Sequence, residues 1–287
     1  MSDENTPVDP ERWHRDELRS GRRFAFGRNW ARYSRLIDAD RIGEAERSLV
    51  EMLGRPRLDG LRFLDAGCGS GLFSLAAVRL GATVTAFDVD PDSVRTTRRL
   101  LSEQAPDGGW TALHGNATDR DFLASLGTFD IVYSWGVLHH TGQMWDACDA
   151  IVAPLAEDGD LFIALYNDAG DKSIMWSRLK RTYVRLPAGL RALYAWGLIA
   201  IGEAKALGGD LAAGRPADWL RRWTGYASAR GMSRYRDWID WIGGYPYEYS
   251  SVEETLAFFS ERGLVPVRVE PNTGTGCSQF VLRRGGR

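Results

Sequence analysis

The sequence predicts a doubly wound α/β fold, with a seven-stranded and mostly parallel sheet, N-terminal helices and a helical insertion after the fifth strand. Two observations support this prediction. Short apolar or β-branched segments alternate with helical segments from residue 62 to residue 166, a pattern typical of parallel strands that helices cover on both faces. The alternation stops at Asn167 and resumes at Val252, which leaves a long helical segment inserted into the sheet domain.

The N-terminal region is predicted to be helical after a short tail. Residues 1–12 are polar and contain two prolines, so we expect them to form a disordered tail. Apolar residues then recur at helical spacing, as between Leu36 and Met52. Residues 13–58 are therefore expected to form helices, either as a lid over a ligand site or simply packed on the sheet.

The sheet domain follows in chain order. Its core, residues 59–166, is expected to contain strands at residues 62–66, 83–88, 111–114, 129–134 and 160–166. The helices of this core are expected at residues 72–80, 92–104, 119–126 and 144–155. Residues 251–287 are expected to close the domain with a helix at 252–262 and strands at 264–270 and 278–282.

The insertion, residues 167–250, contains six of the eleven tryptophans of the chain. A segment placed after the fifth strand lies over the carboxyl ends of the strands, where open α/β sheets bind ligands. Within it, residues 176–187 interleave basic and aromatic side chains, which would suit an anionic or lipid-tailed ligand and contact with a membrane surface. A solvated helix face with an apolar underside is the alternative interpretation.

Composition excludes few functions. The chain carries 36 basic and 38 acidic residues, and a net charge of -2 does not favour nucleic acid as a partner. Its three cysteines are scattered, so we expect neither a metal centre nor a disulfide framework. The N-terminus does not resemble a signal peptide, and the longest apolar run, residues 192–200, is shorter than the roughly 20 residues of a membrane span. We therefore expect a cytoplasmic protein.

A glycine-rich turn, LDAGCGSGLF at residues 64–73, joins the first strand to its helix. Glycine allows the chain to bend sharply there and to approach a ligand closely. The turn lacks the Gly-Lys-Ser/Thr of a P-loop, and Leu72 replaces the third glycine of a dinucleotide fingerprint. The negative charge of the Asp65 carboxylate would be unfavourable beside an anionic pyrophosphate but favourable beside a cationic methionine group. Asp88, at the end of the second strand, is placed to accept hydrogen bonds from ribose hydroxyls.

Four segments carry a resemblance to class I methyltransferases that depend on S-adenosylmethionine (SAM). The glycine turn resembles their first motif and FDVDP at residues 87–91 resembles their second. HGNA at residues 114–117 resembles the segment after the third strand, and FDIVYSWGVLHH at residues 129–140 resembles the fourth-strand motif. Within this family, the chain resembles ubiquinone-biosynthesis O-methyltransferases and sugar O-methyltransferases.

The resemblance implies SAM as the cofactor and a set of residues that would bind it. Asn116 stands where the family commonly has an aspartate, so a contact with the adenine amino group could only use its side-chain carbonyl. The expected cofactor-binding residues are Asp65, Gly67, Gly69, Gly71, Asp88, Val89, Asn116, Ala117 and Ser134.

Two adjacent histidines follow the fourth strand, and they are the candidate catalytic residues. Methyl transfer to a hydroxyl requires a base, and histidine suits that role near neutral pH. In enzymes that this chain resembles, a histidine at the second position faces the methyl group, so we expect His140 to be the general base and His139 to support it. The alternative is that one of them caps the next helix or packs against Trp135. His14 and His114 are expected to be structural.

The acceptor side is predicted from residue type and position. Tyr166 and Asp168 end the fifth strand on the ligand side of the sheet, where Asp168 would bind the acceptor, orient a histidine or cap the loop. Tyr245 and Tyr247 belong to an aromatic loop that leads back to the core. Tyr33, together with Trp30, is expected to form part of the lid.

These observations predict a SAM-dependent methyltransferase that acts on a small molecule, with O-methylation by His140 as the expected chemistry. N- or C-methylation without a strong base is the alternative. A nicotinamide-dependent oxidoreductase is disfavoured by Leu72 and Asp65, and a non-catalytic SAM-binding protein is the remaining hypothesis. Nucleic-acid methylation is disfavoured because Ser134-Trp-Gly-Val137 replaces the Asn/Asp-Pro-Pro-Tyr/Phe tetrad of resembling enzymes.

Overall fold

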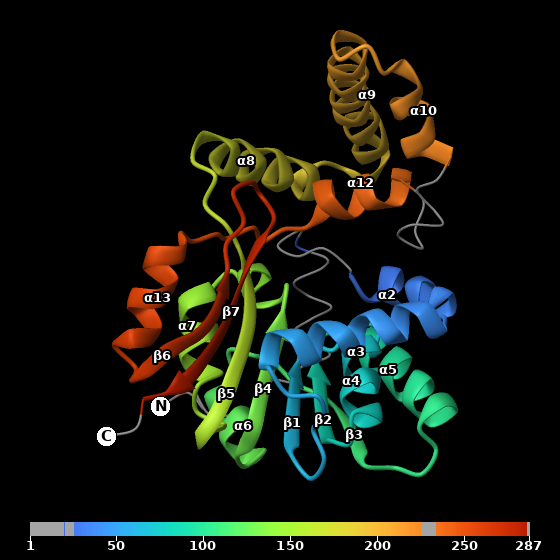
Figure 1. The fold of residues 1–287 in the computed structure, drawn as a ribbon. Helices are drawn as coiled ribbons and strands as arrows, with labels where there is room; N and C mark the ends of the chain where they lie inside the picture. The colour runs from blue at the N-terminus through green and yellow to red at the C-terminus, as the bar shows by residue number, and fades with distance from the viewer. Residues whose placement is uncertain (1–19, 21–25, 225–233, 286–287) are drawn as a thin grey trace, which may run out of the picture.

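The computed structural model describes Ser20, residues 26–224 and residues 234–285, and it contains the predicted doubly wound sheet (Figure 1). The strand order is β3-β2-β1-β4-β5-β7-β6. The strands are β1 (Arg62–Ala66), β2 (Thr83–Asp88), β3 (Trp110–His114), β4 (Phe129–Trp135), β5 (Leu155–Tyr166), β6 (Leu264–Glu270) and β7 (Cys277–Arg284). Strands β1 to β5 pair in parallel, and β7 runs antiparallel to both of its neighbours. The predicted fold class is thus confirmed. The predicted tail, residues 1–12, lies outside the described residues.

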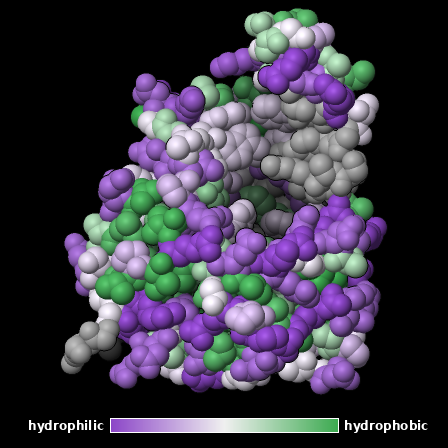
Figure 2. All heavy atoms as spheres, in the orientation of Figure 1, coloured by the Kyte–Doolittle hydropathy of each residue, from purple (hydrophilic) through white to green (hydrophobic). Residues whose placement is uncertain are grey.

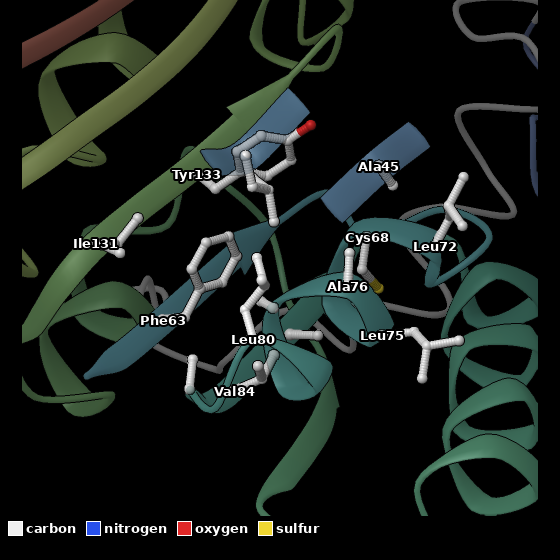
Figure 3. Packing of buried hydrophobic residues seen from close by; sticks show 14 of the residues in the cluster. Ala45, Phe63, Cys68, Leu72, Leu75, Ala76, Leu80, Val84, Ile131 and Tyr133 are labelled. Carbon is white, nitrogen blue, oxygen red and sulfur yellow. The ribbon is translucent and has the colours of Figure 1, made fainter. Parts of the chain in front are cut away.

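Helices cover both faces of the sheet, as the apolar strands require. Successive side chains of a strand point to opposite faces, so Phe63 and Leu64 of β1 enter different apolar cores. The core around Phe63 is covered by α3 (Ala39–Leu53), α4 (Leu72–Arg79) and α5 (Pro91–Gln104). Figure 3 shows part of this core, with Phe63, Ile131 and Tyr133 on the sheet and Leu80 near Phe63. The core around Leu64 is covered by α6 (Arg120–Ser125), α7 (Met144–Ala150) and α13 (Val252–Ser260).

One boundary differs clearly from the prediction. The helix expected to reach residue 155 ends at Ala150, and β5 already begins at Leu155 rather than at residue 160. The carbonyl of Pro154 accepts a hydrogen bond from the Phe129 N–H at 2.8 Å, so the chain is paired with the start of β4 before β5 begins. Proline also lacks the N–H that a continuing helix would use.

The predicted insertion leaves the sheet after β5 and returns at α13. Figure 1 shows it beyond the carboxyl ends of the parallel strands, with α8 lying across them and α9 and α10 projecting away. Its helices are α8 (Asp171–Arg185), α9 (Ala188–Ala212), α10 (Pro216–Thr224) and α12 (Arg234–Gly243). Within the part of the chain that the structure describes, no helix combines the length and apolar character needed to cross a bilayer.

A buried carboxylate holds three helices of the insertion together. Glu203 of α9 accepts hydrogen bonds from three indole N–H groups, those of Trp219 and Trp223 from α10 at 3.0 Å and that of Trp238 from α12 at 2.8 Å. A Cβ on Gly202 would lie 2.6 Å from the Trp238 ring, so glycine makes room for that indole. The position of Trp238 therefore depends on two neighbouring residues of another helix.

The N-terminal helix α2 (Gly27–Tyr33) connects the sheet domain to the insertion; the 3₁₀ turn η1 (Ser34–Leu36) then leads to α3. The Gly27 N–H donates to the Asp90 carboxylate at 2.9 Å, at the start of α5. The Asn29 side-chain amide donates to the Asp240 carboxylate of α12. Through these two contacts, the helix bridges the end of β2 and the last turns of α12.

Candidate active site

A cavity of about 920 Å³ lies at the carboxyl ends of the parallel strands. Figure 2 shows the surface hollowed between the sheet domain and the helices of the insertion. Its walls come from the glycine turn, the ends of β2 to β5, helix α2, the insertion and the segment that leads into β7. The predicted site residues that line it are Tyr33, Asp65, Gly67, Gly69, Asp88, Val89, Asn116, Ala117, His140, Tyr166 and Tyr245.

The glycine turn fits closely under its neighbours. Gly67 and Gly69 have φ angles of 88° and 53°, a region that L-residues with a side chain rarely adopt. A Cβ on Gly67 would lie 2.5 Å from the Val137 side chain, and one on Gly69 would lie 3.2 Å from the indole of Trp30. Gly71, also predicted to bind the cofactor, does not line the cavity; it begins α4 against Thr97 of α5.

Two buried polar side chains face the cavity at the end of the first and fourth strands. The Asp65 carboxylate accepts a hydrogen bond from the Ser74 hydroxyl, and burial, with a smaller contribution from the charge of Asp88, raises the pKa of Asp65 to about 7. The Tyr133 hydroxyl has no hydrogen-bond partner among the described residues. Buried polar groups normally find partners, so both groups suit a ligand that supplies them.

Asp88 stabilises the glycine turn through hydrogen bonds and faces the cavity. Its carboxylate accepts hydrogen bonds from the N–H groups of Gly69 at 3.0 Å and Asp90 at 2.8 Å. A carboxylate can accept about four hydrogen bonds, so these contacts are compatible with ribose hydroxyls as further donors. The carbonyl of Val89 is in turn held by the His114 Nε2 at 2.8 Å, which gives His114 a structural role.

The third and fourth strands contribute fewer polar contacts. Asn116 accepts a hydrogen bond from the Thr118 N–H through its side-chain carbonyl at 3.1 Å, while Asn116 and Ala117 line the cavity. Ser134, predicted to bind the cofactor, is instead buried and does not line the cavity. Its hydroxyl donates to the Ala66 carbonyl at 2.9 Å and so ties β4 to β1.

His140 lines the cavity, and its tautomer follows from one contact. It ends the 3₁₀ turn η2 (Leu138–His140), and its Nδ1 lies 2.6 Å from the carbonyl oxygen of Pro246. A carbonyl can only accept, so Nδ1 carries the proton and the lone pair is at Nε2 in the neutral ring. The rings of Phe26 and Tyr166 pack beside it, with centroids 5.0 and 5.4 Å away.

His139 has a different environment from its neighbour. Its side chain is fully buried and does not line the cavity. Its Nδ1 accepts a hydrogen bond from the Tyr166 N–H at 3.2 Å, and its ring packs on that of Tyr166 with the centroids 3.8 Å apart. Burial lowers the pKa of His139 well below its usual value, and the charges of His140 and Lys180 lower it further. His139 is thus a neutral support at the end of β5. His14 lies outside the described residues.

Not all the expected acceptor residues reach the cavity. Tyr33, Tyr166 and Tyr245 line it, whereas Asp168 and Tyr247 do not. The Asp168 carboxylate accepts the Gly170 N–H at 2.8 Å, which makes it a loop cap before α8. Tyr247 packs behind Tyr166, with ring centroids 4.9 Å apart.

Several lining residues do not follow from the sequence patterns. They come mostly from α2, from the insertion and from the loop before β7, and they include Phe26, Asn29, Trp176, Trp238, Asp240, Trp241 and Cys277. The abundance of tryptophan in the insertion is a visible signal, but which indoles face the cavity depends on helix packing. Among the described residues, no group of three or more His, Cys, Asp or Glu side chains is arranged to hold a metal ion.

Comparisons with known sequences place the match in the sheet domain. Residues 63–159 match a family model described as a methyltransferase domain. The chain is 36% identical over 126 residues to a ubiquinone biosynthesis O-methyltransferase of Methylocella silvestris, a match that covers 41% of this chain and 46% of that protein. It is 34% identical over 117 residues to the enzyme of the same name from Caulobacter vibrioides, covering 39% and 44%. The chain spans about half the length of the curated relatives it matches.

Comparisons with solved structures show the same fold over most of the chain. Magnesium protoporphyrin IX methyltransferase from Synechocystis PCC 6803, with bound SAM, matches with a TM-score of 0.52 and 13% identity, covering 98% of this chain and 100% of that one. PKMT2 from Rickettsia typhi, in complex with AdoHcy, matches with a TM-score of 0.56 and 14% identity, covering 84% and 52%. At such identities the likeness concerns the fold alone.

Proposed function

We propose that the chain is a class I, SAM-dependent methyltransferase that transfers the methyl group of SAM to a hydroxyl group of a small molecule, with His140 as the general base. The observation that carries the proposal is the tautomer of His140, whose side chain lines the cavity. Its Nδ1 proton is directed at the Pro246 carbonyl, so Nε2 is the basic atom of the neutral imidazole.

The glycine-turn half of the cavity fits SAM. Gly67 and Gly69 let the backbone approach the cofactor, and Asp88 would accept hydrogen bonds from its ribose hydroxyls. The buried Asp65 carboxyl group would face the cationic amino group of the methionine moiety, and this contact would favour its ionised form in an otherwise apolar setting. Bound SAM supplies a methyl group on a positively charged sulfur that is already a good leaving group.

The chain's own residues would then align the acceptor and remove its proton. His140 Nε2 would take the proton from the acceptor hydroxyl, while the Pro246 carbonyl holds the ring in the required tautomer. His139 would stay neutral and fix the end of β5 through the Tyr166 N–H. The aromatic side chains of Tyr166, Trp241 and Trp238 would exclude water and orient the acceptor.

The names of the sequence relatives support oxygen as the acceptor atom, since they are O-methyltransferases. Their match covers less than half of this chain, so it carries no argument about the acceptor-side insertion as a whole. The acceptor that these observations support is a small molecule with a hydroxyl group.

The proposal is tested by following a labelled methyl group. We would incubate the full-length protein with SAM that carries a CD₃ group and with a panel of phenols, sugars and amines, and identify products by mass spectrometry and NMR. The expected product carries the CD₃ group on oxygen, and unlabelled SAM gives its light counterpart. Transfer to nitrogen or carbon would contradict O-methylation. A protein that binds NAD but not SAM would contradict the cofactor as well.

A further inference from the structure

Lys180 is a fully buried lysine in α8, behind the acceptor wall of the cavity. Its ammonium nitrogen lies over three aromatic rings, 3.9 Å from the centroid of Trp241, 4.9 Å from that of Tyr247 and 5.9 Å from that of Trp176. Trp241 and Trp176 themselves line the cavity. Lysine is rarely buried without a charged partner, so its place in an aromatic cage requires an explanation.

The ammonium group interacts with the end of a helix rather than with a carboxylate. It donates to the main-chain carbonyl of Trp241, in the last turn of α12. The carboxyl end of a helix carries partial negative charge, which favours a cation there. Among the residues that the structure describes, no carboxylate lies within ion-pair distance of this nitrogen. The positive charge is therefore held by carbonyl and ring electrons and is not cancelled by a paired acid.

The cage lies next to His140. A Cβ built on Gly244 would lie 3.3 Å from His140 Cε1 and 3.5 Å from Lys180 Nζ, so the two side chains approach the same glycine. The Pro246 carbonyl that holds His140 belongs to the loop that begins at this glycine. The charge also reaches the other histidine, since Lys180 contributes to the lowered pKa of His139 after burial itself.

We propose that the caged ammonium of Lys180 keeps the imidazole of His140 neutral and therefore able to accept a proton. Lys180 does not line the cavity, so it is a positioning residue that acts on His140 through its charge. The role as an aid to catalysis rests on the proposed function of His140 as the base, whereas the effect on the protonation of His140 does not. Burial lowers the pKa of Lys180 to about 7, so the ammonium is charged below pH 7, where an imidazole takes up its second proton.

Other titratable groups around His140 would affect it less or in the opposite sense. Asp240 accepts a hydrogen bond from Asn29, and Glu248 accepts hydrogen bonds from the N–H groups of Gly142 and Met144. The ring of Phe26, the residue that precedes α2, also neighbours His140, and it carries no charge. Among the described residues, the titratable groups near His140, or near the glycine and loop that hold it, include His139 on η2, Tyr166 on β5, Lys180 on α8 and Asp240 on α12. The loop after α12 adds Tyr245, Tyr247 and Glu248. Lys180 is the lysine among these groups, and its positive charge disfavours the addition of a second proton to His140.

The test is an NMR titration of His140 in full-length protein labelled with ¹³C-histidine, with the signal assigned by its loss in His140→Ala. Lys180→Met removes the charge and the donor, and Lys180→Gln removes the charge but keeps a donor for the Trp241 carbonyl. In both variants we expect the pKa of His140 to rise by about one pH unit, because a like charge nearby disfavours the protonated ring. Lys172→Met, at an exposed position of the same helix, is the matched control and should leave it unchanged.

Two results decide the proposal. A rise in both variants supports it. A Lys180→Gln variant that titrates like the wild type would show that the hydrogen bond, not the charge, matters, and would overturn it. If Lys180→Met does not fold, the titration of Lys180→Gln decides between these two results without it. The acidic limb of the pH dependence of turnover should move with the pKa of His140. If the pKa moves and this limb does not, the charge effect stands and His140 is not the base.

Discussion

The two halves of the cavity are built in different ways. In the cofactor half, the side chain of Asp88 is bonded to backbone N–H groups of its own loop and of the adjacent turn, and Gly67 donates to the Phe87 carbonyl at 2.8 Å. In the acceptor half, the contacts join distant parts of the chain: Asn29 to Asp240, His140 to Pro246 and Lys180 to Trp241. A short stretch of chain can thus define a cofactor site, whereas an acceptor site depends on how whole helices pack.

The largest expected effect concerns the cofactor half. Gly67→Val should abolish measurable SAM binding, weakening it by about a hundredfold or more, since a φ of 88° disfavours a side chain and its Cβ would lie 2.5 Å from the Val137 side chain. Gly108→Val is the matched control, because Gly108 has a φ of 87° but no atom within 4 Å of a Cβ there. Calorimetry that finds unchanged SAM affinity in Gly67→Val would contradict the cofactor assignment.

A smaller effect is expected when the side chain that supports the acceptor half, Glu203, is removed. Glu203→Ala removes the acceptor of three indole N–H groups and should lower the free energy of unfolding by about 2 kcal/mol. Because Trp238 loses its position on the wall, the KM for the acceptor should rise while SAM affinity stays near the wild-type value. Glu203→Gln keeps one acceptor oxygen and should lose less. Denaturant unfolding and calorimetry would measure both quantities; an equal loss of SAM affinity would mean that the two halves are not separable.

The smallest effect is a pH dependence of SAM binding. The folded protein holds the proton of Asp65 up to about pH 7, well above the unfolded value, so its carboxylate must ionise before it can face a cationic amine. SAM affinity should therefore rise by about tenfold between pH 6 and pH 8 and level off above that. In the absence of SAM, the sign for stability is opposite: the folded state binds the proton more tightly than the unfolded state, so stability falls as pH rises toward 7. Asp65→Asn should remove the dependence of affinity on pH, and an unchanged slope in that variant would assign it to another group.

The sequence is sufficient to predict the sheet and much of the cofactor half. The strand periodicity and the spacing of glycines are local, so Asp65, Gly67 and Asp88 can be placed at the cavity from short segments alone. Position in a motif does not fix side-chain direction, however. Ser134 belongs to such a motif, yet its hydroxyl points to the Ala66 carbonyl and not into the cavity. Gly71 likewise caps the start of α4 and does not line the cavity.

The acceptor half can be predicted only in part. Tyr166, Tyr245 and His140 follow elements whose ends can be located in the sequence, and they line the cavity. Trp238 does not follow from its own segment, because Glu203, 35 residues away, sets its place. In the sequence, Lys180 is only one of several basic residues on a helix face. Its burial follows from the packing of α8 on α12, and no pattern of spacing reports such packing.

The most direct test of the central claim compares turnover with cofactor affinity in His140→Ala. If the core binds SAM and His140 activates the acceptor, turnover should fall by about 10²–10⁴-fold, the range for loss of a general base, while calorimetry finds SAM affinity unchanged. His139→Asn is the control, since its side-chain carbonyl can still accept the Tyr166 N–H, and it should keep most of its turnover. A His140→Ala variant that retains wild-type turnover, or that loses SAM affinity in proportion to its turnover, would contradict the account.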